Sequence, residues 1–285
     1  MKVIITGSNG YIGKNLVYRL ESEGFECIPA KRMWWSRQIE EISELLADSD
    51  IVINLAGAPI LKRWTKRNTD EIYNSRILLT QKLVSAIHLL PSAKRPKIFI
   101  TASAIGIYEN GSLHDETSTQ YDDGFLGKLV QDWEQVSLTL PGSVRRVVFR
   151  TGLVLGKESK TIANMVPLFK IGLGGRISKG KQPFPFIHID DLVLAFVWAI
   201  KNQDASGVFN LVSPQSVTNK QFTTALAKQL RRPAFFIIPA FILRIIYGKA
   251  SQLLVDSPKV TPVKLIKMGF VFQKPSIEDS LADIA

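Results

Sequence analysis

The sequence predicts an α/β protein built on a doubly wound parallel sheet, with a smaller C-terminal lobe. Strand and helix patterns alternate over the first 150 residues, which is typical of a parallel sheet covered on both faces. After Arg150 the pattern changes, because Gly and Pro concentrate between Gly172 and Pro185 and the elements become shorter. We therefore expect residues 1–230 to form a Rossmann-type domain, with insertions for the lobe after about residue 150. Residues 231–285 are expected to form a small C-terminal domain.

The elements can be placed in chain order. Short runs rich in β-branched residues predict strands at 2–6, 26–29, 51–55, 97–102 and 144–150. Apolar residues at intervals of three and four predict helices at 14–23, 38–47, 65–90, 125–140 and 192–201. We expect Asp190 or Asp191 to cap the last helix, and His188 to be structural rather than part of a metal or acid–base site.

Three glycines follow the first strand at intervals of three, at Gly7, Gly10 and Gly13. A helix N-terminus carries unpaired N–H groups and a partial positive charge, which suit a pyrophosphate. Gly7 permits the tight turn, Gly10 leaves room for the phosphates, and Gly13 lets the helix pack close to the strand. The order of strand, loop and helix predicts a bound dinucleotide, held by these glycines together with Asn9, Tyr11 and Ile12.

The ends of the next two strands refine the cofactor prediction. The second strand ends at Lys31 and Arg32, where an NAD-specific enzyme places an acidic residue against the ribose hydroxyls. An ammonium and a guanidinium instead suit a 2′-phosphate, so we predict NADP(H). The third strand runs into a segment where small residues let the backbone lie against the cofactor, at Leu55, Ala56 and Gly57.

The composition excludes several functional classes. The chain has 285 residues, 46% of them hydrophobic, and a formal net charge of +11. Its Lys and Arg residues are scattered, without the basic helix of a nucleic-acid module, so we expect no nucleic-acid partner. No apolar stretch reaches the roughly 18 residues needed to span a bilayer, and we expect no membrane partner. The single Cys27 fits a reducing compartment, which favours a cytoplasmic protein.

Further motifs follow the glycine loop and carry a family resemblance. They include Arg63-Trp64, Ser103-Ala104-Ile105-Gly106-Ile107-Tyr108, Asp132-Trp133-Glu134, Arg150-Thr151-Gly152-Leu153-Val154, Ile187-His188-Ile189-Asp190-Asp191 and Gly269-Phe270. On these residues the chain resembles the extended or atypical short-chain dehydrogenase/reductases of the NAD-dependent epimerase/dehydratase superfamily. More narrowly, it resembles the epimerase-family branch, formerly cell-division-inhibitor-like, with a C-terminal domain of unknown function. The resemblance implies a Rossmann-type fold that binds NADP(H), with contacts from Glu71 and Arg76 and with Val154 near the nicotinamide half.

The residues for redox chemistry are incomplete. The wider superfamily uses a Ser or Thr, a Tyr, and a Lys placed four residues after the Tyr on one helix face. None of the six tyrosines has a Lys four residues later, and if Lys128 is the motif lysine, the tyrosine position is Gly124. Ser103, Tyr108 and Lys128 are our candidate catalytic residues, and Tyr121 is a further candidate proton donor.

The Gly-rich segment offers a substrate site. Basic residues in comparable lobes of the superfamily hold a nucleotide-sugar diphosphate. Arg176 and Lys181 are therefore candidates for binding a phosphorylated or nucleotide-linked small molecule. The alternative is that they are ordinary solvated residues of a loop.

Two hypotheses for the function remain open. The chain is either an NADP(H)-dependent oxidoreductase or epimerase, or a non-catalytic NADP(H)-sensing protein that binds a protein partner. A homodimer is compatible with both, and no metal is expected.

Overall fold

The computed structural model describes residues 1–284, apart from the side chain of Arg32. Its centre is a six-stranded parallel sheet with the order β10-β6-β4-β3-β1-β2. The strand order reverses between β1 and β3, and open α/β sheets bind ligands beyond the carboxyl ends of their strands at such a point. The six strands are β1 (Lys2–Thr6), β2 (Glu26–Ala30), β3 (Ile51–Asn54), β4 (Ile98–Ala104), β6 (Arg145–Thr151) and β10 (Gly207–Leu211).

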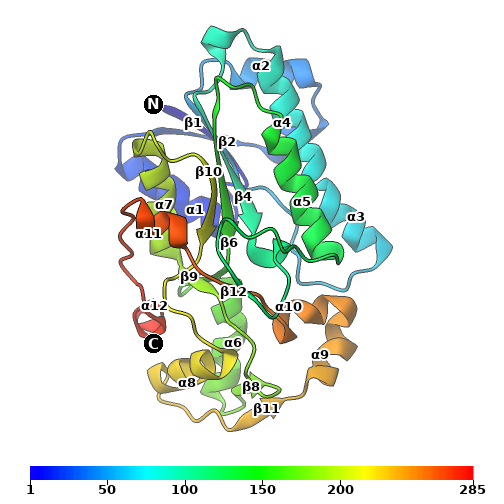
Figure 1. The fold of residues 1–285 in the computed structure, drawn as a ribbon, viewed down its shortest axis with the longest axis vertical. Coiled ribbons are helices and arrows are strands. Elements are labelled where there is room, and N and C mark those ends of the chain that lie inside the picture. Colours follow the sequence, from blue (N-terminus) through cyan, green and yellow to red (C-terminus); the bar gives the residue numbers. More distant parts are fainter. Residues whose placement is uncertain (285) are drawn as a thin grey trace.

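Helices cover both faces of this sheet (Figure 1). Side chains of a strand alternate between the faces, so Val3 and Ile5 enter one core cluster and Ile4 enters another. Strands buried on both faces are apolar throughout, which explains the unbroken runs in β1 and β3. The predicted doubly wound fold is confirmed. The first face carries α1 (Tyr11–Ser22) and α7 (Ile189–Lys201), and the second carries α2 (Ile39–Leu46), α4 (Ile77–Leu89) and α5 (Phe125–Leu138).

A buried polar network joins the carboxyl ends of β1 and β3. Thr6 Oγ1 donates to Asn54 Oδ1 at 2.8 Å and accepts from the N–H groups of Leu55 and Ala56, each at 3.1 Å. Asn54 Nδ2 donates to Thr80 Oγ1 of α4 at 2.9 Å. Buried polar groups need such partners, so the network fixes the backbone that leaves β3.

The prediction of one long helix at 65–90 is wrong, because the chain bends between α3 (Lys66–Asn74) and α4. Ser75 Oγ accepts a hydrogen bond from the N–H of Ala58 at 2.9 Å. Arg76 is the N-cap of α4, with φ −108°, and donates from Nη2 to the carbonyl of Ala58 at 3.1 Å. The bend therefore anchors the loop that follows β3.

The lobe lies beyond the carboxyl edge of the sheet, in the lower half of Figure 1. Its small parallel pairs join β8 to β11, β7 to β9, and β5 to β12. The predicted domain boundary after residue 230 stays a prediction. The remaining elements are η1 (Arg32–Ser36), β5 (Leu113–His114), β7 (Leu153–Leu155), α6 (Lys160–Lys170), β8 (Gly175–Ile177), β9 (Phe186–His188), α8 (Asn219–Gln229), β11 (Phe236–Ile238), α9 (Ala240–Tyr247), α10 (Gln252–Val255), β12 (Lys259–Val260), α11 (Val263–Lys267) and α12 (Ile277–Leu281), with short 3-10 turns at Ser92–Lys94, Ile105–Ile107 and Gly248–Ser251.

The expected cap of the helix near residue 192 is also wrong. α7 begins at Ile189, and His188 is its cap, with Nδ1 accepting from the N–H of Asp190 at 3.2 Å. Asp191 is fully buried and its carboxylate accepts from the N–H groups of Gln273 and Lys274, at 2.6 and 3.0 Å. The Asp191 carboxylate thus holds the C-terminal segment against α7 instead of capping the helix.

Across residues 1–284, no helix combines the length and the apolar character that crossing a membrane requires.

We predict that Asn54→Ala lowers the free energy of unfolding by about 2–3 kcal/mol, because Thr6 and Thr80 lose a buried partner. Urea denaturation of the purified protein measures this change. Asn110→Ala, at an exposed position in a turn, is the control and should stay within about 0.5 kcal/mol of the parent. Equal changes in the two variants would contradict the structural role of the network.

Candidate active site

The glycine loop between β1 and α1 is held in shape by close backbone contacts. Gly7 has φ +70°, and a Cβ on it would lie 2.9 Å from the N of Ala56 and the O of Leu55. A Cβ on Gly13 would lie 2.3 Å from the carbonyl O of Gly7. Gly10 is exposed, and its nearest neighbour would be 3.3 Å away. Gly7 and Gly13 therefore enforce the turn, while Gly10 leaves an open surface above it.

The N-terminus of α1 is open to an anion. Its N-cap is Gly10, no side chain caps it, and its first turn contains no acidic residue. The neighbouring Asn9 is exposed and Ile12 is half-buried. The unpaired N–H groups and the helix dipole favour a negatively charged ligand at this point. The geometry fits a pyrophosphate, as the sequence predicts.

Tyr11 faces the lobe rather than the glycine loop. A Cβ on Gly156, just after β7, would lie 2.2 Å from the Tyr11 hydroxyl. Burial, with smaller contributions from Asp283 and Asp190, raises the pKa of Tyr11 to about 12. The phenol is therefore neutral at physiological pH. Val154 of β7 is half-buried and packs against the core on the face of α7.

The predicted 2′-phosphate site lies at the end of β2. Lys31 is exposed and directly follows the strand, at the start of η1. The side chain of Arg32 lies outside the described part of the chain. The roles assigned to both residues stay predictions.

The loop after β3 packs against Arg76. A Cβ on Gly57 would lie 2.9 Å from the Arg76 guanidinium carbon, and Arg76 Nη1 donates to the carbonyl of Ile72 at 3.1 Å. The guanidinium lies 5.5 Å from the centre of the Trp133 ring, and burial lowers the pKa of Arg76 to about 10. Arg76 thus supports the backbone beside the predicted cofactor segment, and its direct contact with the cofactor stays a prediction.

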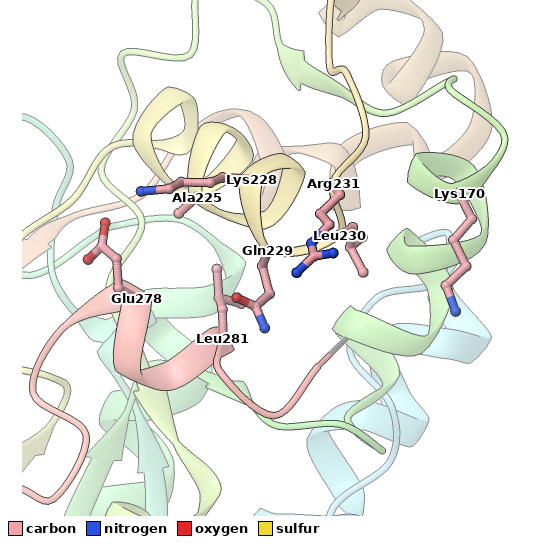
Figure 2. A pocket seen from close by; sticks show the side chains of 8 residues that line it. All are labelled: Lys170, Ala225, Lys228, Gln229, Leu230, Arg231, Glu278 and Leu281. Carbon is pink, nitrogen blue, oxygen red and sulfur yellow. The ribbon is translucent and has the colours of Figure 1, made fainter.

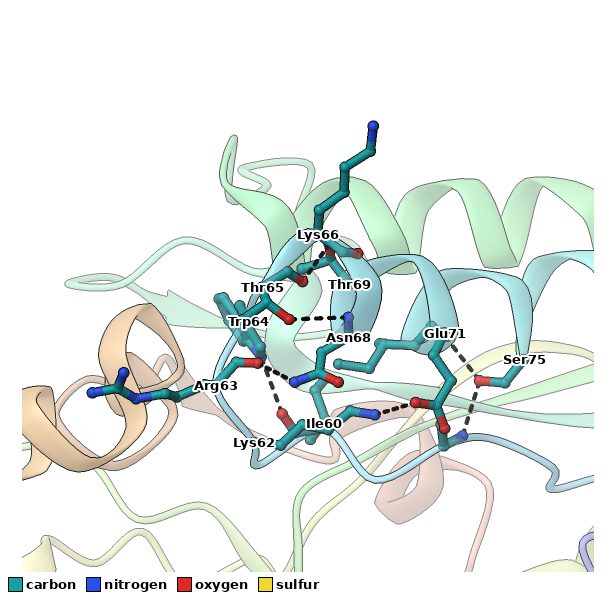
Figure 3. Close-up of polar contacts among 12 residues, drawn as sticks. Ile60, Lys62, Arg63, Trp64, Thr65, Lys66, Asn68, Thr69, Glu71 and Ser75 are labelled. Carbon is teal, nitrogen blue, oxygen red and sulfur yellow. Dashed lines mark hydrogen bonds and ion pairs between the residues drawn. The ribbon is translucent and has the colours of Figure 1, made fainter.

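The same loop continues towards the lobe, as Figure 3 shows. Lys62 Nζ lies 2.6 Å from Glu71 Oε2, so the exposed Glu71 interacts with the loop. Asn68 Nδ2 donates to the carbonyl of Arg63 at 2.7 Å. Arg63 in turn donates from Nε to the carbonyl of Ile246 at 3.1 Å, and from Nη2 to that of Ile245. These carbonyls lie in the last turn of α9, so one arginine joins the loop to the lobe.

Ser103 belongs to a buried ionic network at the carboxyl end of β4. Its hydroxyl donates to Glu134 Oε1 at 2.5 Å. Arg150 of β6 binds both carboxylate oxygens of Glu134, from Nε at 2.8 Å and from Nη2 at 2.7 Å. Although burial lowers the pKa of Arg150, the hydrogen bonds and charge of Glu134 raise it overall. The motifs that contain Glu134 and Arg150 were identified in the sequence, but their spacing along the chain did not indicate that the two residues form an ion pair.

Tyr108 is bound into the same network. Only 1% of its surface is exposed; its hydroxyl accepts from Arg150 Nη1 at 2.8 Å and donates to Asn210 Oδ1 at 2.8 Å. Burial raises the pKa of Tyr108, and Arg150 partly opposes that rise. The Arg150 guanidinium also lies over the half-buried ring of Tyr121, 5.6 Å from its centre. Tyr108 is therefore placed to orient Arg150, and its burial argues against direct contact with a substrate.

Lys128 and the tyrosine position lie near the start of α5. Gly124 is the N-cap of this helix, and a Cβ on it would lie 2.9 Å from Asp122 Oδ2. The same oxygen accepts from the N–H groups of Gly124 and Gly127, each at 3.1 Å. Lys128 is exposed on the first turn. If Lys128 is the motif lysine, Asp122 thus occupies the space beside the tyrosine position.

The predicted substrate residues differ in their surroundings. Arg176 lies in β8, and its Nε is buried without a hydrogen-bond partner among the described residues. Lys181 is exposed in the turn that follows. A buried donor without a partner is rare in native proteins and points to a missing acceptor.

Within residues 1–284, no group of three or more His, Cys, Asp or Glu side chains is arranged to hold a metal ion.

His188 is surrounded by charged groups. Its Nδ1 lies 3.3 Å from Asp190 and its Nε2 lies 3.4 Å from Asp283, while Lys274 lies within 4.0 Å of both carboxylates. Burial is the largest influence and lowers the pKa of His188, although Asp190 and Asp283 oppose it. The imidazole is therefore neutral at pH 7 and serves as the helix cap.

Two family models match the chain. Residues 3–212 match the NAD dependent epimerase/dehydratase family, and residues 238–284 match a domain of unknown function, DUF1731. A mouse protein, "Epimerase family protein SDR39U1", is 35% identical over 294 residues, which cover 100% of this chain and 99% of that protein. "Epimerase family protein SDR39U1 homolog, chloroplastic" from Arabidopsis thaliana is 34% identical over 303 residues, covering 100% and 86% of the two chains.

Solved structures agree with these matches. The crystal structure of human epimerase family protein SDR39U1 with NADPH superposes with a TM-score of 0.93 at 32% identity, covering 100% of this chain and 99% of that one. UDP-glucuronic acid 4-epimerase from Bacillus cereus, solved with UDP-glucuronic acid and NAD, has a TM-score of 0.79 at 19% identity, covering 99% and 96%. The second likeness concerns the fold alone.

We predict that acidification from pH 7 to pH 5 destabilises the protein through His188. Its pKa is lower in the folded than in the unfolded chain, so the unfolded state binds more protons below the ordinary value near 6.5, and stability falls as the pH falls. The slope contributed by one such group is at most about 1.4 kcal/mol per pH unit. Urea denaturation at several pH values should show a shallower slope for His188→Gln than for the parent. The exposed His88→Gln is the control, and an unchanged slope in His188→Gln would refute the assignment.

Proposed function

The chain belongs to the NAD dependent epimerase/dehydratase family, and on this premise we propose that it binds NADP(H) and acts as an oxidoreductase or epimerase on a small substrate. The glycine loop at the open end of α1 carries the proposal, because Gly7 and Gly13 permit a turn that any side chain would disrupt. The NADPH in the human SDR39U1 structure supports the choice of cofactor. Lys31 and Arg32 would hold the 2′-phosphate, and the N–H groups at the start of α1 would hold the pyrophosphate.

Bound NADP(H) supplies or accepts a hydride, so the chain itself must orient the substrate and provide a route for the proton. We assign the proton route to Ser103. Its hydroxyl donates to Glu134, which pairs with Arg150, so Ser103 Oγ would take a proton from the substrate as its own proton passes to Glu134, and the reverse transfer would serve reduction. Lys128, exposed on the first turn of α5, is a further candidate for supplying a positive charge. Tyr108 acts as a positioning residue for Arg150.

The lobe suggests the character of the substrate. The buried Nε of Arg176 lacks a partner among the described residues, which supports binding of an anionic group such as a phosphate. β11 and α9 carry large apolar side chains that are exposed, including Phe236, Phe241 and Ile245. A phosphorylated or nucleotide-linked substrate with an apolar or planar portion would use both features. Lys181 is a secondary candidate because it is exposed close to Arg176 in the chain.

The single cysteine bears on the cellular location of the protein. The thiol of Cys27 is half-buried, and burial raises its pKa to about 11, so it is unreactive as a thiolate at neutral pH. We propose a cytoplasmic location on the basis of this single free thiol, while the Arabidopsis relative is described as chloroplastic. A homodimer stays a prediction.

NADPH binding can be measured by fluorescence titration. Gly13→Ala should abolish it, because the added Cβ would lie 2.3 Å from the backbone of Gly7. Gly142→Ala is the matched control, since nothing lies within 4 Å of a Cβ at that position. Lys31→Asp should weaken NADPH at least about tenfold and leave NADH unchanged, as expected for one charge-assisted phosphate contact. Equal affinities of the parent for NADPH and NADH would refute the 2′-phosphate site.

Turnover can be followed as NADPH oxidation against a panel of carbonyl compounds and nucleotide sugars. Ser103→Ala and Lys128→Met should each lower kcat by at least about tenfold, the size of a general acid–base contribution, with NADPH affinity unchanged. The exposed Ser92→Ala and Lys94→Met are controls with full activity. Tight NADPH binding without turnover of any compound would favour the non-catalytic sensing protein.

A further inference from the structure

A second hollow lies between α6, α8 and α12, outside the site described above (Figure 2). Its volume is about 610 Å³, which is within the range of pockets that bind small molecules. None of the predicted cofactor, catalytic or substrate residues lines it. The hollow is lined by Lys170 of α6, by Lys228 and Gln229 of α8, by Leu230 and Arg231 of the following turn, and by Glu278 and Leu281 of α12.

The hollow carries an excess of positive charge. Lys170, Lys228 and Arg231 contribute three cations, whereas Glu278 contributes one anion. In the part of the chain that the structure describes, none of the three cations forms an ion pair or a side-chain hydrogen bond. Unpaired cations around a concave surface raise the local concentration of anions. The hollow is therefore suited to an anionic ligand.

Arg231 adopts an unusual backbone conformation. Its φ is +52°, in the left-handed region, where it ends α8. The N–H of Arg232 bonds to the carbonyl of Ala227 at 3.0 Å, and that of Arg231 to the carbonyl of Lys228 at 3.1 Å. Glycine is the usual residue at such a helix end, because it alone adopts this conformation without strain. A long cationic side chain at a strained position beside a hollow is the kind of outlier that marks binding sites.

The other lining residues suit an organic group. Gln229 Nε2 donates to the carbonyl of Ala282 at 2.9 Å, which directs the amide across the hollow and leaves Oε1 as an acceptor. Leu281 is buried beneath, and Leu230 lies half-buried at the end of α8. Figure 2 shows Gln229, Arg231 and Leu281 grouped around the open space, with Lys170 on its far side.

We propose that this hollow binds an organic phosphate of nucleotide size. Arg231 holds the phosphate through its guanidinium fork, and Lys170 and Lys228 balance the remaining charge. The organic part lies on the half-buried Leu230, above the buried Leu281, with Gln229 as its hydrogen-bonding partner. The site shares no residue with the glycine loop, so it does not depend on the proposed NADP(H) binding.

The hollow has a structural connection to the substrate lobe. The N-terminal end of α8 is hydrogen-bonded to the segment of β8: the N–H of Ile177 donates to Asn219 Oδ1 at 2.8 Å, and that of Lys220 to the carbonyl of Gly180 at 2.9 Å. A ligand at the C-terminal end of α8 therefore binds the same helix that holds the strand of Arg176.

Calorimetric titration with ADP tests the proposal, with saturating NADP⁺ present to occupy the glycine loop. ADP should bind, and Arg231→Gly should weaken it at least about tenfold, in line with the loss of one charge-assisted phosphate contact. Glycine suits the left-handed backbone, so this variant should fold and should melt at a temperature no lower than the parent. Lys160→Gln, at the opposite end of α6 from Lys170, is the control and should bind as the parent does.

Two further probes separate the contributions. Adenosine lacks the phosphates and pyrophosphate lacks the organic part, so both should bind at least about tenfold more weakly than ADP. Adenosine binding equal to that of ADP, pyrophosphate binding equal to that of ADP, or an unchanged ADP affinity in Arg231→Gly would each overturn the proposal. If NADP⁺ itself fails to bind, the proposed cofactor site fails, while dependence of ADP binding on Arg231 still supports the hollow.

Discussion

A buried arginine organises the carboxyl edge of the sheet. Arg150 is 3% exposed, and a charge buried to this degree is tolerated only when it is paired and hydrogen-bonded. Glu134 of α5 pairs with the Arg150 guanidinium and accepts two hydrogen bonds from it, and the hydroxyl of Tyr108, in the loop after β4, accepts a third. Asn210 of β10 then binds Tyr108, and its backbone N–H donates to Glu116. One charge thus fixes the positions of two strands, one helix and a loop, and removing Glu134 would leave Arg150 as an unpaired buried ion.

This network also explains how the chain departs from the chemistry of its superfamily. A tyrosine at the start of α5 would compete with Asp122, which caps the helix at Gly124. The phenol that is present, Tyr108, is instead enclosed behind Arg150 and is not free to exchange its proton with a substrate. The hydroxyl of Ser103, backed by a carboxylate and a guanidinium, is what the fold offers at this edge. Under the proposed function, this hydroxyl and its ion pair would take the place of the phenol.

Local signals in the sequence were sufficient for the glycine loop and for five of the six strands of the sheet, whereas the edge strand β10 was not predicted. Strand periodicity and the spacing of Gly7, Gly10 and Gly13 depend on neighbours a few residues away, so both could be predicted. The break at Ser75 could not be predicted, because it depends on a hydrogen bond with Ala58, which is distant in the chain. The cap by His188 could not be predicted either, because Asp191 is bound by the backbone of Gln273 and Lys274 and is therefore not available to cap the helix. For the same reason the contacts of Ser103 with Glu134, and of Tyr108 with Arg150 and Asn210, could not be predicted, since these partners are 31 to 102 residues away.

The link from Arg63 to the last turn of α9 has a thermodynamic consequence. Arg63 lies in the loop that begins at Leu55, on the predicted cofactor side, and its guanidinium ends on the carbonyls of Ile245 and Ile246. A shift of this loop on cofactor binding would act on the lobe through these two hydrogen bonds. By linkage, a substrate that favours one position of the lobe changes the affinity for the cofactor by the same factor as the cofactor changes the affinity for the substrate. The Arg63 link offers a structural route for such coupling, and because the coupling is reciprocal it sets no order of binding.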